Sequence, residues 1–269
     1  MKKKILIFSG THPRHLYVNS TFLNFKNFEC RAIVMKREKL IPLIKKNKDK
    51  NNFENLKKHF LTRELKEKKC FGNLNYKTIF KKIDHLVCES KNLNSTKVYN
   101  YVKNYKPHFT FIFGVDLIKN PILKLINKKN LNLHLGLSPW YKGSATLFWP
   151  FYFLEPNYAG STFHEINENI DDGPILHQTV SKLSKGQGIH DVANDVVICS
   201  KKDLVKIFKR FEKNQKFKFI KQKKIGKTFY TNSFKPHHLK IIYNLFNDKI
   251  VDYYIKNIKK KKIKLVKFV

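Results

Sequence analysis

The chain has 269 residues, 42% of them hydrophobic, which is enough to bury a sizeable core in one large or two small domains. Its formal net charge is +35, but only five of its 55 basic residues are arginines; because base recognition and bidentate phosphate contacts favour arginine, we expect a solvated lysine-rich surface and no specific nucleic-acid partner. The sequence holds no apolar run of the roughly 18 residues that span a membrane and no Cys-x-x-Cys pair, so it predicts a cytoplasmic protein with no membrane span and no metal site.

The chain begins with an apolar segment, residues 5–10, that predicts a buried strand and is too short for the core of a signal peptide. The loop after it enters a helix. In an open parallel sheet this loop lies at the carboxyl ends of the strands, where ligands bind. Arg14, with His12 and His15, is therefore a candidate to hold a phosphate or diphosphate of a substrate, although an ordinary surface loop is the alternative.

The next segment predicts a second strand at residues 31–35, followed by a polar, lysine-rich insertion at about 36–82. Within it, residues 52–69 have a helical pattern. We assign no chemistry to this insertion and expect solvated helix. A short strand is predicted at 85–88, followed by a helix from its cap at 94–95 to about residue 105.

An apolar strand is predicted at residues 110–113, ending at Gly114. The following apolar run carries Asn132 and His134, and two residues so spaced on a strand point to the same face of the sheet. Asp171 follows 37 residues after His134, in a turn-like Asp-Asp-Gly-Pro cluster.

Asn132, His134 and Asp171 together are the groups that acyl transfer to an amine requires. The amide stabilises a developing oxyanion, the imidazole moves a proton, and the carboxylate fixes the charge and tautomer of the imidazole. Taken singly, such a histidine or such a turn is more often structural than catalytic. The order and spacing of the whole set make it the candidate catalytic site.

Residues 148–153 are densely aromatic, which indicates core or subunit interface. Strands are predicted at 160–166 and 174–180, and a long amphipathic helix at 189–211. Strands that alternate with helices in this way predict an α/β fold with a Rossmann-like, doubly wound parallel sheet.

Residues 212–269 predict a small C-terminal α+β extension, with a strand at 227–231 and helices at 236–246 and 250–258. Lysines at 259–262 and 264 form a basic run that we expect to be a solvated tail. A contact of this run with phosphate or RNA, or a role of the overall charge in attracting an acidic surface or substrate, is the alternative.

The sequence resembles the folate-dependent formyltransferases in three places: the Asn-x-His pair, a Leu-x-Pro-x-x-x-Gly loop at residues 137–143, and Ile-Asp-x-Gly at 170–173. The resemblance is best over about 84–180. It implies that residues 1–211 form a formyltransferase catalytic domain, with catalytic positions at Asn132, His134 and Asp171. It also implies that N10-formyltetrahydrofolate is the co-substrate and gives its formyl group directly to a primary amine, without a metal.

The same resemblance implies which segments bind the folate and the acceptor. The pterin pocket is expected after the 110–113 strand and in the loop that precedes Asp171, and Gly143 of the motif loop joins the expected acceptor contacts. The expected folate contacts are Gly114, Leu117, Ile118, Glu168, Asn169 and Ile170.

Two departures from the family bear on the acceptor. Gly136 stands where many members have serine, and residues 10–13 do not match the Gly/Ser-rich phosphate loop of glycinamide ribonucleotide formyltransferases. The 212–269 extension also leaves no room for the barrel that methionyl-tRNA formyltransferases add. It is similar in size to those of sugar N-formyltransferases, where such extensions often support dimers, so a homodimer is one expectation for this chain.

We therefore expect the acceptor to be a small, phosphorylated amine, and in the first place an amino sugar linked to a nucleoside diphosphate. Glycinamide ribonucleotide and methionyl-tRNA are the alternatives within the family. A non-catalytic basic binding protein on the same fold is the alternative outside it.

Overall fold

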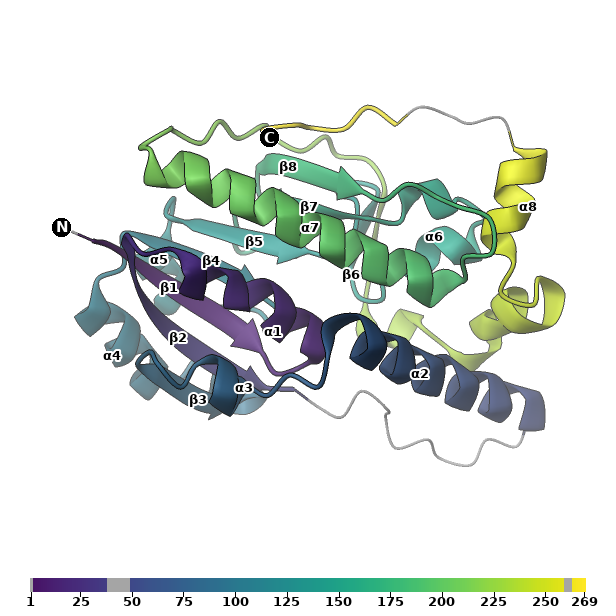
Figure 1. Cartoon of the computed structure of the whole chain (residues 1–269), viewed down its shortest axis with the longest axis horizontal. Helices are drawn as coiled ribbons and strands as arrows, with labels where there is room; N and C mark the ends of the chain where they lie inside the picture. The colour runs from purple at the N-terminus through teal and green to yellow at the C-terminus, as the bar shows by residue number, and fades with distance from the viewer. Residues whose placement is uncertain (1, 38–48, 259–262) are drawn as a thin grey trace.

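The computed structural model describes residues 2–37, 49–258 and 263–269 (Figure 1). The strands are β1 (Lys3–Gly10), β2 (Phe28–Lys36), β3 (His85–Glu89), β4 (Phe109–Phe113), β5 (Asn130–His134), β6 (Tyr141–Gly143), β7 (Gly160–His164), β8 (Ile175–Val180) and β9 (Lys227–Phe229). The α-helices are α1 (Pro13–Asn19), α2 (Lys50–Phe71), α3 (Tyr76–Ile79), α4 (Thr96–Tyr105), α5 (Ile122–Ile126), α6 (Trp149–Tyr152), α7 (Ile189–Glu212) and α8 (Ile250–Asn257).

The main sheet has the strand order β3-β2-β1-β4-β5-β7-β8. The first five strands in this order are parallel, which confirms the Rossmann-like, doubly wound prediction. β7 and β8 lie where strands were predicted but run antiparallel to their neighbours. The connection between them holds no helix, and antiparallel strands need no crossover helix to be joined.

Both faces of this sheet are covered, as the apolar run at residues 5–8 of β1 requires. Alternate residues of β1 enter different cores: Ile5 and Ile7 pack beneath α1 and α7, whereas Leu6 and Phe8 pack against α4 and α5. α1 and α7 lie on the side toward the viewer in Figure 1. The core therefore leaves the carboxyl edge of the parallel strands open for a site.

The insertion is more than solvated helix. Of its residues, 38–48 lie outside the described part of the chain, and α2 begins after Asp49, whose side chain accepts a hydrogen bond from the Asn52 amide. α2 buries Asn55, His59, Glu67 and Phe71. Positions four apart are offset by about 40° around a helix, so these buried side chains form a stripe that winds along α2 against the body of the protein.

The C-terminal extension differs from its prediction in one helix. β9 pairs in parallel with β6 as a small second sheet, and α8 lies where a helix was predicted. The predicted helix at 236–246 is instead a 3-10 turn (Pro236–His238) followed by one π turn (Ile241–Leu245). Residues 259–262 of the basic run lie outside the described residues.

The extension is joined to the rest of the protein rather than separate from it. The backbone amide of Gln178 in β8 donates to the Val266 carbonyl at 2.9 Å, and the Val266 amide donates to Oε1 of the Gln178 side chain at 2.8 Å. The aromatic segment 148–153 contributes Phe148, Trp149 and Phe151 to a core shared with α7 and the extension. Of the two predicted roles, core or subunit interface, these residues take the first. None of the described helices is long and apolar enough to cross a membrane.

Candidate active site

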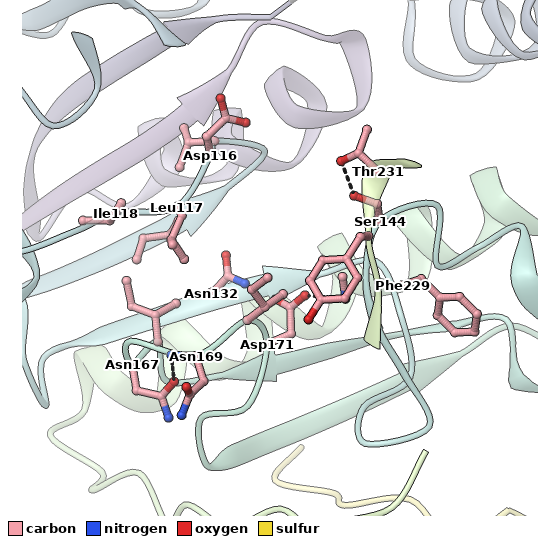
Figure 2. Close-up of a pocket in the computed structure, with 16 residues that line it drawn as sticks. Asp116, Leu117, Ile118, Asn132, Ser144, Asn167, Asn169, Asp171, Phe229 and Thr231 are labelled. Atoms are coloured by element: carbon pink, nitrogen blue, oxygen red, sulfur yellow. Dashed lines mark hydrogen bonds between the residues drawn. The ribbon is translucent and has the colours of Figure 1, made fainter. Parts of the chain in front are cut away.

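The structure brings Asn132, His134 and Asp171 together at the end of β5. His134 Nδ1 lies 3.2 Å from Asp171 Oδ2. Asn132 and Asp171 line one cavity of about 280 Å³, which we call the amide–carboxylate cavity (Figure 2). The three residues that sequence order singled out thus form one cluster, with the amide and the carboxylate facing the open space.

His134 stands behind Asp171 and is held at both ring nitrogens. Nδ1 faces Asp171, and Nε2 lies 3.0 Å from the Tyr141 carbonyl oxygen. Both partners can only accept, so a ring that makes both contacts carries a proton on each nitrogen. Burial outweighs the opposing effects of the Asp171 carboxylate and the Tyr141 carbonyl, so the pKa of His134 is lowered. Protonation of this ring therefore depends on its contact with Asp171.

Gly136 provides the space that this ring occupies. A Cβ atom on Gly136 would lie 2.2 Å from His134 Nε2 and 2.5 Å from the Tyr141 carbonyl oxygen. The departure from the usual serine therefore leaves room for the hydrogen bond between the imidazole and that carbonyl. Its effect falls on the position of His134.

Asp171 is fixed by two hydrogen bonds and by its backbone conformation. It accepts a hydrogen bond of 2.9 Å from the Gly143 amide, its backbone adopts a left-handed conformation with φ of 48°, and its carbonyl accepts from Gln222 at 2.8 Å. Burial works to raise the pKa of this carboxyl, but His134, His164 and the Gly143 amide outweigh it and hold the pKa well below its ordinary range. Asp171 is therefore an anion at neutral pH.

His164 belongs to the same cluster, although no sequence motif marks it. It lies opposite Asn132 in the β5–β7 register, with its Nε2 3.0 Å from Asn132 Nδ2 and 3.4 Å from Asp171 Oδ1. Its Nδ1 lies 2.8 Å from the Glu165 carbonyl oxygen and therefore carries a proton, while Nε2 faces both the Asn132 amide and the Asp171 carboxylate. His164 is 1% exposed, so it orients Asn132 from behind.

Most of the predicted folate contacts line the amide–carboxylate cavity. Leu117, Ile118, Asn169 and Ile170 do so. Gly114 does not; with φ of 83° it packs on the His15 ring, where a Cβ would come within 2.3 Å. Glu168 is also outside the lining, and accepts a hydrogen bond of 2.8 Å from the Asn120 side chain at the exposed rim.

A second cavity of about 400 Å³ adjoins the first, and we call it the arginine cavity. Three of the five arginines in the chain line it: Arg14 from α1, Arg37 after β2 and Arg63 from α2. Beneath them, Oε1 of Glu67 accepts from Nε of Arg14 at 2.9 Å and from Nε of Arg63 at 2.8 Å. Burial works to raise the pKa of Glu67, but the two guanidinium groups lower it to about 2.

The structure divides the predicted substrate contacts. Arg14 lines the arginine cavity and Gly143 the amide–carboxylate cavity. His12 and His15 line neither; their rings stack on each other with centroids 5.3 Å apart. Burial, His12 and Arg14 lower the pKa of His15 well below its ordinary value, so His15 packs there as a neutral ring.

The arginine cavity also contains two histidines that the sequence did not single out. His59 of α2 and His190 of α7 line it, with ring centroids 4.5 Å apart. Burial is the main reason that the pKa of His190 falls to about 3 and that of His59 falls well below its usual value. Within the described residues, buried Nε2 of His190 has no hydrogen-bond partner, which is expected where a ligand supplies one.

The two cavities meet at a pair of hydroxyl groups. Ser144 and Thr231 line both cavities, and their oxygens lie 3.1 Å apart (Figure 2). Thr231 comes from the C-terminal extension. Within the described ranges, no group of three His, Cys, Asp or Glu side chains is arranged to hold a metal ion.

An amide, an imidazole and a carboxylate gathered at the carboxyl edge of a mostly parallel sheet are groups that can serve acyl transfer. The sequence matches the family model described as formyl transferase over residues 18–208, which is more than half of the chain. The chain therefore belongs to the formyl transferase family.

Individual relatives resemble parts of the chain. It is 32% identical over 120 residues to the bifunctional polymyxin resistance protein ArnA of Wigglesworthia glossinidia brevipalpis, a match that covers 44% of this chain and 18% of that protein. It is 34% identical over 86 residues to the GDP-perosamine N-formyltransferase of Brucella melitensis biotype 1, covering 32% of this chain and 33% of that protein. These matches span less than two thirds of the relatives' own length.

Solved structures share the fold over most of the chain. A 4-N formyltransferase from Francisella tularensis superposes with a TM-score of 0.57 at 16% identity, covering 86% of this chain and 78% of that one. A phosphoribosylglycinamide formyltransferase from Anaplasma phagocytophilum superposes with a TM-score of 0.56 at 13% identity, covering 86% of this chain and 99% of that one. At these identities the likeness concerns the fold.

Proposed function

We propose that this protein transfers a formyl group from N10-formyltetrahydrofolate to the primary amine of a small phosphorylated acceptor, an amino sugar linked to a nucleoside diphosphate. The observation that carries the proposal is that Asn132 and an ionised Asp171 face one cavity, with His134 paired to Asp171 behind it. Family membership supplies the reaction class.

The amide–carboxylate cavity fits the folate as co-substrate, which supplies the activated formyl carbon. Leu117, Ile118 and Ile170 give it an apolar wall, and Asn167 and Asn169 place amide groups beside that wall. A flat heteroaromatic ring with polar edges needs this combination of apolar contact and a few hydrogen-bonding groups.

The three clustered residues have distinct roles in this proposal. The Asn132 amide has two N–H groups; one points at His164 Nε2, and the other is available for an oxygen that gains negative charge. Asp171 attracts the acceptor amine and assists its loss of a proton. His134 faces Asp171 through Nδ1 and so keeps the carboxylate in place.

The arginine cavity is the place for the acceptor's phosphate groups. Arginine presents a planar fork that matches phosphate geometry, and the chain concentrates three of its five arginines here. The unpartnered Nε2 of His190 adds a hydrogen-bonding group for an uncharged part of the acceptor. A phosphorylated small amine fits this wall, and glycinamide ribonucleotide is the second candidate because it also carries a phosphate.

The test is a transfer assay with formyl-tetrahydrofolate and a panel of amines: nucleotide-linked amino sugars, glycinamide ribonucleotide and methionyl-tRNA. We expect formylation of an amino-sugar nucleotide, detected by mass spectrometry, and loss of it in Asp171→Asn and His134→Ala. Binding of folinic acid, read as a rise in Tm, checks the folate cavity separately; saturation at about 100 Kd adds roughly 2.7 kcal/mol of stability.

Three results would contradict the proposal in different ways. Transfer to methionyl-tRNA alone would reassign the acceptor. Near-wild-type turnover in either variant would remove the mechanism. Folate binding without transfer to any amine would favour a non-catalytic binding protein on this fold.

A further inference from the structure

The hydroxyl pair formed by Ser144 and Thr231 stands at the boundary of the two cavities. Asn132 and Asp171 lie on one side of it, and Arg14, Arg37 and Arg63 on the other. Figure 2 shows Ser144 and Thr231 across the cavity from Leu117 and Ile118, with their side chains joined. A molecule held at the arginines has to pass this pair to bring an amine to Asp171.

The pair is fixed relative to the catalytic carboxylate by the backbone. The amide of Gly143 donates to Asp171, and the next amide, that of Ser144, donates to the Phe229 carbonyl at 2.7 Å. The Ser144 carbonyl in turn accepts from Trp149 Nε1 at 3.0 Å. Because consecutive amides bind Asp171 and the β9 strand, the Ser144 hydroxyl has a set position beside the reacting groups.

The close approach of the two segments depends on Gly143. Its φ is 91°, and a Cβ there would come within 2.1 Å of the Phe229 carbonyl oxygen. This approach brings Thr231, two residues after Phe229, to the Ser144 hydroxyl. Thr231 lies outside the 18–208 family match, so the extension adds a side chain to the site that the family match does not assign.

The chemistry of the pair indicates what it binds. Each hydroxyl is one donor and accepts twice, and the bond between them uses one donor and one acceptor position. One donor and several acceptor positions remain. A ligand hydroxyl, which both donates and accepts, satisfies that set, whereas a carbonyl satisfies only the donor and an ammonium only the acceptors.

We propose that Ser144 and Thr231 bind a hydroxyl group of the acceptor next to its reacting amine, and so select amino alcohols of the sugar type. This inference rests on the proposed function and names one determinant of its acceptor. Glycinamide ribonucleotide has no hydroxyl beside its amine, so the pair favours an amino sugar over it.

The experiment compares two nucleotide-linked amino sugars, one with a hydroxyl on the carbon next to the amine and one with a hydrogen there. Ser144→Ala and Thr231→Val are measured beside the wild type for kcat/KM with each acceptor and for the Kd of folinic acid. A hydrogen bond of ordinary strength predicts a loss of roughly three- to tenfold per variant with the hydroxylated acceptor. With the deoxy acceptor, we expect wild type and variants to be equal, and the Kd of folinic acid to be unchanged throughout.

Asn232→Ala is the matched control, because Asn232 is exposed in the same turn and lines neither cavity. It should behave as wild type with both acceptors. If wild type transfers the formyl group but the two hydroxyl variants lose the same kcat/KM with both acceptors, or keep the kcat/KM of wild type, the inference is wrong and the proposed function stands. If wild type transfers to no amine, the proposed function fails, and the inference fails with it.

Discussion

Glu67 offers a test of the arginine cavity that needs no substrate. Its side chain is 1% exposed and lies between Arg14 and Arg63, which lower its pKa from 4.5 to about 2 against the effect of burial. A carboxyl with that depressed pKa stabilises the folded state by about 3 kcal/mol where it is ionised. Glu67→Gln resembles the protonated side chain, so we expect it to lower the free energy of unfolding by about 3 kcal/mol at pH 7.

The pH dependence follows from the sign of the shift. Because the folded-state pKa lies below the unfolded one, the stabilisation by Glu67 is complete above about pH 4.5 and is lost as the pH falls toward 2. The wild type should therefore lose about 3 kcal/mol more than Glu67→Gln across that window, and the two curves should converge at its acid end. Urea denaturation at a series of pH values measures both curves.

Glu64→Gln is the matched control on the same helix. Glu64 pairs with Lys68 at 2.8 Å, four residues along the more exposed face of α2, and such pairs contribute only about 0.3–0.5 kcal/mol. If Glu67→Gln is as stable as wild type at pH 7, or if Glu64→Gln costs as much, the buried arginine–carboxylate cluster does not stabilise α2 as we infer.

Three further predictions concern the site and the surface charge. Gly136→Ala should displace the His134 ring, because the added Cβ would lie 2.2 Å from Nε2. We expect kcat to fall by about 10² and the Kd of folinic acid to stay unchanged. Unaltered turnover would show that the position of the imidazole is not critical. Arg14→Ala should raise the KM of the acceptor far more than that of the folate, and equal effects on both would assign Arg14 another role. Nucleic acid should bind weakly at physiological salt and without sequence preference, and the logarithm of its binding constant should fall with the logarithm of the salt concentration by about 0.9 per neutralised phosphate. Tight, tRNA-selective binding at that salt would make methionyl-tRNA the first candidate acceptor.

The parallel part of the fold could be predicted because its signals are local. β1 and β4 are apolar runs of strand length, and α4 follows a serine whose side chain accepts from the Val98 amide. The prediction of a helix at 236–246 was wrong, and the cause is also local. Pro236 begins a 3-10 turn, and the Ile241–Leu245 segment continues as a single π turn instead of an α-helix.

The candidate site was predictable only where it follows a motif. Asn132, His134 and Asp171 belong to motifs that follow one another in a recognisable order, and the structure places them in one cluster. His164 carries no such signal, because it reaches Asn132 through the pairing of β5 with β7, and strand pairing across the sheet is set by tertiary packing. Thr231 depends in the same way on the pairing of β6 with β9.

α2 shows why a polar segment can hide part of a site. Residues 55, 59, 63, 67 and 71, one every four positions, form a stripe that winds around the helix and faces the rest of the protein. Four of these five residues are polar or charged, so a search for apolar periodicity finds no buried face. Polar groups on a buried face are costly unless each finds a partner, and here Arg63 and Glu67 partner each other while Arg63 and His59 face a cavity. In this chain the middle of the polar stripe, His59 and Arg63, lines the arginine cavity, and Glu67 supports it from beneath.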